Sequence, residues 1–168
     1  MNNGAKIKNN ILGIDPGNTI IGYGVLNCKN GTEKPKAIGY GYIDLKMYPS
    51  QGKRLLSLHE DLKELLHRYK PNSIAIENLY FFKNAKTFTA VMESKGVILL
   101  TAAQFNINVY EYTPLQIKQT ISGYGRADKK LIQKLIQSSL NITPNIKPDD
   151  ASDALAIALC HLRHLTHF

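Results

Sequence analysis

The sequence has no apolar run that approaches the length of a membrane span, and it contains only two cysteines. About 20 consecutive apolar residues are needed to cross a bilayer, so no membrane-spanning segment is expected. The polar stretch from Met1 to Asn10 lacks the apolar middle of a secretory signal, which favours the cytoplasm. Cys28 and Cys160 lie far apart and match no metal-binding or redox spacing. We therefore expect both to be buried, reduced thiols.

Acidic residues are also scarce relative to basic ones. The 168 residues include 21 Lys and Arg but only 13 Asp and Glu, which gives a formal net charge of +8. Such an excess is typical of proteins that bind a polyanion, most often nucleic acid. A membrane surface is a less favoured partner, because no strongly basic amphipathic helix is present. The length suits one compact domain. We expect a polar N-terminal extension over residues 1–10 and a single domain over residues 11–168.

The order of the predicted elements indicates an α/β domain with one mixed sheet. Turn signals after the first two strands predict that the first three strands form an antiparallel meander. The expected strands cover residues 11–14, 19–28, 36–45, 73–76 and 108–112, and the expected helices cover about 50–69, 83–105, a short segment after 114, 127–140 and a last one from about 149. Leading strands followed by alternating helices and strands predict a five-stranded mixed sheet flanked by helices. The helix over 83–105 is apolar on two sides, which favours contact with a second subunit.

Near the end of the chain, the stretch KPDDASDALAIAL begins an apolar helix with three aspartates. Asp150 and Asp153 are three residues apart, so on a helix they share a face, with Cβ atoms roughly 5–6 Å apart. Their repulsion costs on the order of 0.2–0.5 kcal/mol, while each gains about 0.3–1 kcal/mol near the helix N-terminus. Taken alone, the segment therefore favours helix capping, a role that suits Asp149, over a metal site.

Two further carboxylates stand at predicted strand ends. Asp15 ends the strand in ILGIDPG, where turn capping is the simpler explanation, whereas Glu77 in SIAIENL is neither a good strand residue nor a good cap. If these strands are neighbours and the last helix packs over their ends, both carboxylates meet those of Asp150 and Asp153. Four close anions repel one another unless cations neutralise them. Such oxygen ligands suit Mg²⁺ or Mn²⁺, and two ions could together promote phosphodiester hydrolysis.

Four stretches, GIDPGNTIIGYGV, AIENLYFFKNAKT, QIKQTISGYGRADKK and DDASDALAIAL, follow one another along the chain. In that order they resemble the RuvC family, bacterial endonucleases that resolve four-way (Holliday) DNA junctions in recombination and repair. The likeness extends from Ile11 to about His161. It implies an RNase H-like fold, a homodimer, and Mg²⁺-dependent nicking of two strands of like polarity that leaves 5′-phosphate ends. It also implies that Mn²⁺ can substitute, that each active site holds two ions, and that a branch-migration helicase complex is a partner.

The resemblance assigns roles to particular side chains. The acidic tetrad of the family, which is both catalytic and metal-binding, falls on Asp15, Glu77, Asp150 and Asp153 of this sequence. Some relatives carry histidine in place of Asp153, so that ligand is the most replaceable. Tyr80 aligns with an aromatic residue that contacts bases in the family. Stacking on an unpaired base is worth roughly 1–3 kcal/mol, although aromatics in this stretch could instead anchor the following helix in the core.

Basic residues further along are candidates for contacts with DNA phosphates. Lysines in the first turn of a helix oppose its dipole, so Lys129 needs another reason for its position, and a bound phosphate supplies one. A solvated charged face is the alternative. The resemblance favours contacts with DNA for Lys118 and Lys129, and Arg126 lies in the loop that leads to the latter. Lys118 could also stabilise charge on the reacting phosphate.

His161 and His164 are three residues apart on the last predicted helix. His161 is eight residues beyond Asp153, or roughly 12 Å along a helix axis, which is too far to share its site. We expect both histidines at the surface, near the helix C-terminus.

The sequence favours a homodimeric, metal-dependent, junction-resolving endonuclease, with the helix around residues 88–105 as its dimer interface. Three alternatives remain at this stage. The first is another RNase H-like nuclease that acts on a different nucleic acid. The second is a sugar-kinase or actin-like ATPase, suggested by the DPGNT turn, although such folds need a second phosphate loop and about twice this length. The third is a junction-binding protein without catalysis.

Overall fold

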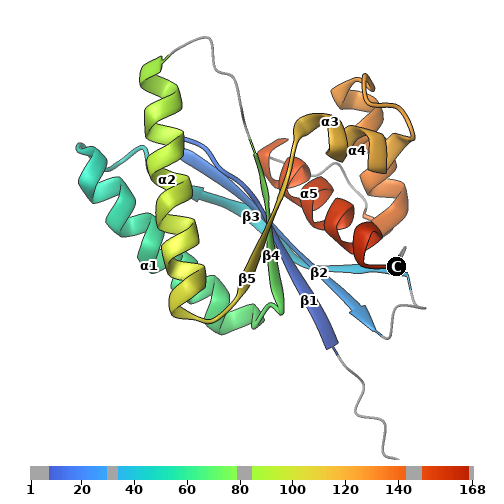
Figure 1. The fold of residues 1–168 in the computed structure, drawn as a ribbon, viewed down its shortest axis with the longest axis horizontal. Helices are drawn as coiled ribbons and strands as arrows, with labels where there is room; N and C mark the ends of the chain where they lie inside the picture. Colours follow the sequence, from blue (N-terminus) through green and yellow to red (C-terminus); the bar gives the residue numbers. More distant parts are fainter. Residues whose placement is uncertain (1–7, 30–33, 79–84, 143–148, 167–168) are drawn as a thin grey trace, which may run out of the picture.

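A computed structural model describes residues 8–29, 34–78, 85–142 and 149–166, and these form five strands and five helices (Figure 1). The strands are β1 (Lys8–Asp15), β2 (Ile20–Lys29), β3 (Lys36–Asp44), β4 (Ser73–Glu77) and β5 (Asn108–Tyr112). The helices are α1 (Gln51–Tyr69), α2 (Ala85–Gln104), α3 (Pro114–Ser122), α4 (Lys129–Leu140) and α5 (Asp149–Thr166). These elements follow the predicted ranges closely. The main difference is that β1 begins at Lys8, so the end of the expected extension over 1–10 belongs to the sheet.

The five strands form one mixed sheet in the order β3-β2-β1-β4-β5. Neighbouring strands are antiparallel among β1, β2 and β3, whereas β4 is parallel to both β1 and β5. This arrangement confirms the predicted mixed sheet with three antiparallel leading strands. The last paired residues of β1 and β4 are Ile14 and Ile76. Asp15 and Glu77 come next on each strand, so they end side by side at the carboxyl edge of the sheet.

Helices cover both faces of the sheet (Figure 1). On one face, Leu12 and Ile14 of β1 pack in a buried cluster with residues of α1 and α2. On the other face, Ile11 packs in a second cluster with residues of α3, α4 and α5. A central strand that is buried on both faces reads as a continuous apolar run, as ILGI does in β1. None of the helices in the described part of the chain combines the length and the apolar character that crossing a bilayer requires.

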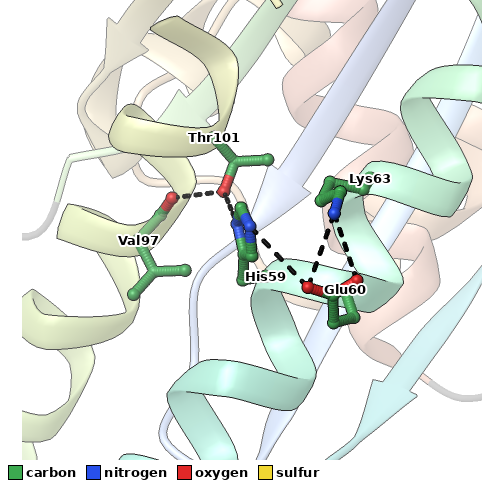
Figure 2. Close-up of polar contacts among 5 residues, drawn as sticks. All are labelled: His59, Glu60, Lys63, Val97 and Thr101. Atoms are coloured by element: carbon green, nitrogen blue, oxygen red, sulfur yellow. Dashed lines mark hydrogen bonds and ion pairs between the residues drawn. The ribbon is translucent and has the colours of Figure 1, made fainter. Parts of the chain in front are cut away.

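A partly buried polar contact adds to the apolar packing between α1 and α2 (Figure 2). The Thr101 hydroxyl, which is fully buried, donates a hydrogen bond to the Val97 carbonyl at 2.7 Å, so it accepts one from His59 Nδ1 at 2.8 Å. Nδ1 of His59 therefore carries a hydrogen, and Nε2 lies 3.8 Å from Glu60, which also pairs with Lys63 at 3.2 Å. This contact fixes how α2 lies along α1.

Candidate active site

Glycines on β1 and β2 let α5 lie directly on the backbone of the sheet. A Cβ atom added to Gly22 would stand 2.2 Å from the carbonyl oxygen of Asp150, and one added to Gly13 would stand 2.1 Å from that of Ala154. Both distances are far below van der Waals contact, so neither position accepts a side chain without moving the helix. Gly22 is the register partner of Asp15. The close packing therefore brings the first turn of α5 to the end of β1.

The carboxylates at the two strand ends belong to one electrostatic cluster with those of α5. Burial raises the pKa of Asp15 to about 8, and the charges of Glu77, Asp153 and Asp150 add to this effect. Burial likewise raises the pKa of Glu77 to about 7, with a further contribution from Asp153. Charges influence one another in this way only at short range. The four predicted acidic residues thus lie within electrostatic range of one another near the carboxyl edge of the sheet.

Two lysines lie beside these acids. The Lys129 ammonium is 2.9 Å from Asp153 Oδ2 and 3.4 Å from Asp149 Oδ2. The charge of Lys118 lowers the pKa of Glu77, although burial of this carboxyl outweighs that effect. A pocket of about 200 Å³ opens between the two lysines and the acids. Four charged residues line it, namely Glu77, Asp153, Lys118 and Lys129. The rest of the lining is apolar and consists of Pro114, Ile117, Ile132, Ala156 and Ile157.

The donor atoms of the cluster suit a hard divalent cation. The carboxylates of Asp15 and Glu77 are partly buried, and neither accepts a hydrogen bond from another described residue. A buried carboxylate without a donor is costly when ionised, and a cation with oxygen ligands would remove that cost. Among the residues that the structure describes, no three acidic, histidine or cysteine side chains are close enough together to hold an ion. Instead, the carboxylate of Asp153 is bound by Lys129.

The remaining predicted site residues are placed less completely. Tyr80 lies outside the described residues. Arg126 is exposed in the segment between α3 and α4, and it makes no hydrogen bond or ion pair with another residue in the described ranges. Asp149 lies inside the first turn of α5 and accepts a hydrogen bond from Gln133 Nε2 at 3.1 Å. Because Asp149 is the first described residue of α5, the capping role expected for it stays a prediction.

The prediction of a surface position is wrong for His161, which is 1% exposed. Its two ring nitrogens lie 2.7 Å from the Tyr112 hydroxyl and 3.0 Å from Ser73 Oγ. Burial, with a smaller contribution from the charge of His164, lowers the pKa of His161 to about 4, so this histidine is neutral at pH 7. The polar partners on β4 and β5 explain why α5 tolerates a histidine on its buried face. The prediction for the cysteines is confirmed, since both are buried thiols that form no disulfide.

We expect the metal-free protein to lose stability as the pH rises from about 4 to 8. In this range the folded state binds more protons than the unfolded state, because the pKa values of Asp15 and Glu77 are raised to about 8 and about 7. Mg²⁺ prefers the ionised carboxylates, so it should raise Tm more at about pH 8.5 than at about pH 5.5. Calorimetry at both pH values, with and without Mg²⁺, checks this. An equal rise at both would show that these two carboxyls do not bind the ion.

The fold and the acidic cluster together define an RNase H-like protein with a carboxylate site of the kind suited to phosphodiester hydrolysis. A family model described as crossover junction endodeoxyribonuclease RuvC matches residues 11–161. The chain therefore belongs to the RuvC family.

Individual relatives agree with this assignment. The crossover junction endodeoxyribonuclease RuvC of Caldicellulosiruptor saccharolyticus is 49% identical over 152 residues, which cover 90% of this chain and 91% of the relative. The corresponding protein of Petrotoga mobilis is 50% identical over 151 residues, with 90% and 91% covered. Among solved structures, Thermus thermophilus RuvC in complex with Holliday junction substrate matches with a TM-score of 0.88 at 29% identity, and the match covers 94% of this chain and 95% of that one.

Proposed function

We propose that this protein is a divalent-metal-dependent endonuclease that resolves four-way DNA junctions by nicking two strands of like polarity. The observation that carries the proposal is the meeting of Asp15, Glu77 and the first turn of α5 at one edge of the sheet. Carboxylates from three separate elements lie there beside a pocket that is also lined by Lys118 and Lys129. The same fold, in a relative of 29% sequence identity, has been seen in complex with a Holliday junction.

The proposed ligands of Mg²⁺ are Asp15, Glu77, Asp150 and Asp153, and Mn²⁺ should occupy the same site. Two ions held there would activate a water and stabilise the leaving oxygen. The family resemblance implies 5′-phosphate and 3′-hydroxyl ends. The partial burial of Asp15 and Glu77 keeps competing water away from their oxygens. Close packing on Gly22 holds Asp150 against the end of β1.

The basic residues beside the acids are proposed to hold the DNA backbone. Lys118 lines the pocket together with Glu77, so its ammonium stands where a phosphate must come to meet the acids. Lys129 begins α4, where the helix N-terminus adds a favourable field for an anion. Arg126 is exposed next to this helix start and is a candidate for a second phosphate contact. Tyr80 remains a proposed base-stacking residue.

A cleavage assay with three matched substrates tests the proposal. A four-way junction, a linear duplex of the same sequence and a DNA–RNA hybrid are each incubated with the protein and Mg²⁺. We expect symmetric nicks in the junction and rates at least about 100-fold lower on the other two, a difference of roughly 3 kcal/mol in activation free energy. Equal cutting of linear duplex would contradict junction selectivity, and preferential cutting of the hybrid would favour another RNase H-like nuclease.

Symmetric cleavage of a four-way junction requires two active sites, so a homodimer is part of the proposal. On the outer side of α2, Leu99 and Leu100 are 37% and 59% exposed. Leucines exposed next to each other on a long helix are typical of an interface between subunits. A branch-migration helicase complex is the further partner that we propose from the family resemblance.

Replacing Leu100 with glutamate should convert the dimer into a monomer. A charge at the centre of an apolar interface is left unpaired on association, which typically costs about 2 kcal/mol or more and weakens a dimer at least about 30-fold. Light scattering coupled to gel filtration measures the mass at micromolar concentration. Leu165→Glu is the matched control, because Leu165 is 47% exposed on α5, on the other face of the sheet. A dimer that persists in Leu100→Glu and is lost in the control would place the interface elsewhere.

A further inference from the structure

The cation nearest to Asp153 in the described part of the chain is the side chain of Lys129. Its ammonium donates a hydrogen bond to Asp153 Oδ2 at 2.9 Å and lies 3.4 Å from Asp149 Oδ2. The Lys129 side chain is 52% exposed and that of Asp153 is 35% exposed, so the pair stands at the mouth of the pocket rather than in the core. Both side chains therefore have room to change partners without disturbing the fold.

Two ligands compete for this pair once the protein acts on DNA. A divalent ion at the acidic cluster requires the oxygens of Asp153, which are bound by the ammonium of Lys129. A DNA phosphate at the start of α4 requires that ammonium. Lys129 cannot direct its charge fully at both partners, and Asp153 cannot give its oxygens fully to both cations. The exchange of partners links the two binding events.

We propose that Lys129 is a positioning residue that holds Asp153 in the DNA-free protein and releases it when a DNA phosphate takes over the ammonium. Binding of DNA thereby raises the affinity of the acidic cluster for a divalent ion. By thermodynamic reciprocity, occupation of Asp153 by an ion also frees Lys129 and raises the affinity for DNA. This inference rests on the metal site of the proposed function. It adds that the site binds a divalent ion more tightly when DNA is bound.

The position of Lys129 on α4 favours such an exchange. Asp128 caps α4 by accepting a hydrogen bond from the Leu131 amide at 2.8 Å, so the backbone around Lys129 is fixed and only its long, half-exposed side chain needs to move in the exchange. The burial of Lys129 lowers its pKa, but its hydrogen bond to Asp153 and the charges of Asp153 and Asp149 more than offset this and raise it overall. The ammonium is therefore charged while it pairs with Asp153.

The first test is the affinity of the DNA-free protein for Mn²⁺, followed by electron paramagnetic resonance. Loss of a partly exposed ion pair should tighten Mn²⁺ binding about three- to fivefold in Lys129→Gln. Lys130→Gln is the control, because it removes the same charge one residue along, and Lys130 is exposed and makes no hydrogen bond or ion pair with another described residue. An equal change in both variants would overturn the inference.

A double-mutant cycle separates a direct contact from a general effect of charge. In the Asp153→Asn background, Lys129→Gln should change Mn²⁺ affinity less than about twofold, because the contact has already been removed. The same cycle is read a second time as junction binding in EDTA, where no cleavage occurs. There Asp153→Asn should strengthen junction binding, and Lys129→Gln should abolish most of that gain.

The outcomes of the cycle also separate this inference from the proposed function. If the parent binds Mn²⁺ but the effects of the two substitutions simply add, the Lys129 exchange is wrong and the metal site stands. If neither the parent nor any variant binds Mn²⁺, the metal site itself is wrong and the exchange falls with it. Melting curves of all variants confirm that each is folded.

Discussion

Asp15→Asn should reduce the rate of junction cleavage by about 1,000-fold or more. The same substitution should make the metal-free protein more stable at alkaline pH. The loss of activity corresponds to about 4 kcal/mol of transition-state stabilisation, a reasonable value for a metal ligand. The gain in stability follows from burial, which raises the pKa of Asp15 to about 8 and so makes its ionised form costly in the folded protein. An amide removes that charge, so Tm without metal should rise by at least about 2 °C at about pH 8.5.

Asp44→Asn is the matched control for this substitution. Asp44 is an exposed carboxyl at the end of edge strand β3, where its Oδ1 accepts a hydrogen bond from the Lys46 amide. We expect this variant to keep its cleavage activity and to be no more stable than the parent at alkaline pH. Cleavage rates, together with scanning calorimetry in EDTA, measure both properties. An active Asp15→Asn protein, or one that is less stable than the parent at high pH, would contradict the role assigned to Asp15.

Gly22→Ala should cause the second large effect, although it changes no charged group. The added methyl would stand 2.2 Å from the carbonyl oxygen of Asp150 and 2.6 Å from its carbonyl carbon. Because backbone atoms cannot rotate away, the first turn of α5 must lift from the sheet and carry Asp150 and Asp153 with it. We expect cleavage to fall at least about 100-fold, since a displacement near 1 Å in a catalytic site can have that cost. The free energy of unfolding should fall by about 1–3 kcal/mol.

Gly52→Ala provides the same chemical change at a site with free space. A Cβ atom on Gly52, in the first turn of α1, would meet nothing within 4 Å. This control should keep full activity and should be as stable as the parent or slightly more stable, because alanine favours helix over glycine by about 1 kcal/mol at interior positions. If Gly22→Ala cleaves junctions as fast as Gly52→Ala, close packing of α5 does not position the acidic site.

The sequence predicts most of the fold because its local signals agree with one another. The run ILGI followed by Asp15-Pro16-Gly17 indicates both a buried strand and its end, and the structure confirms both. The leucines of α1 recur at helical spacing, and Leu58, Leu62 and Leu66 are the buried ones. Alternation of helices and strands then leaves few topologies open, which is why the mixed sheet could be predicted.

Features that depend on contacts across the sheet were not predictable in the same way. Gly13 and Gly22 let the backbone of α5 lie directly against the sheet. A glycine in a strand does signal a close approach of backbone, but not which element approaches. His161 was misplaced for a similar reason, because its partners Ser73 and Tyr112 lie on two other strands. Periodicity shows that a helix face is buried, but it does not show which polar groups of other elements lie against that face.

The arrangement of the four acidic residues could be predicted in part from the sequence. Asp150 and Asp153 share a helix face by spacing alone, and that part needs no tertiary information. Their approach to Asp15 and Glu77 depends on β1 and β4 being parallel neighbours, which the sheet confirms. The ion pair between Lys129 and Asp153 could not have been predicted, because it depends on how α4 is placed against α5.

Cleavage of a four-way junction by the parent and by Asp150→Asn, each with Mg²⁺ and with EDTA, tests most directly whether the converging carboxylates form the active site. In Mg²⁺, the parent should nick two strands of like polarity, and in EDTA it should bind the junction without cutting it. Asp150→Asn should bind the junction in both conditions and cut it in neither. Cleavage in EDTA by the parent, or undiminished cleavage by Asp150→Asn, would contradict a metal-dependent site at this edge of the sheet.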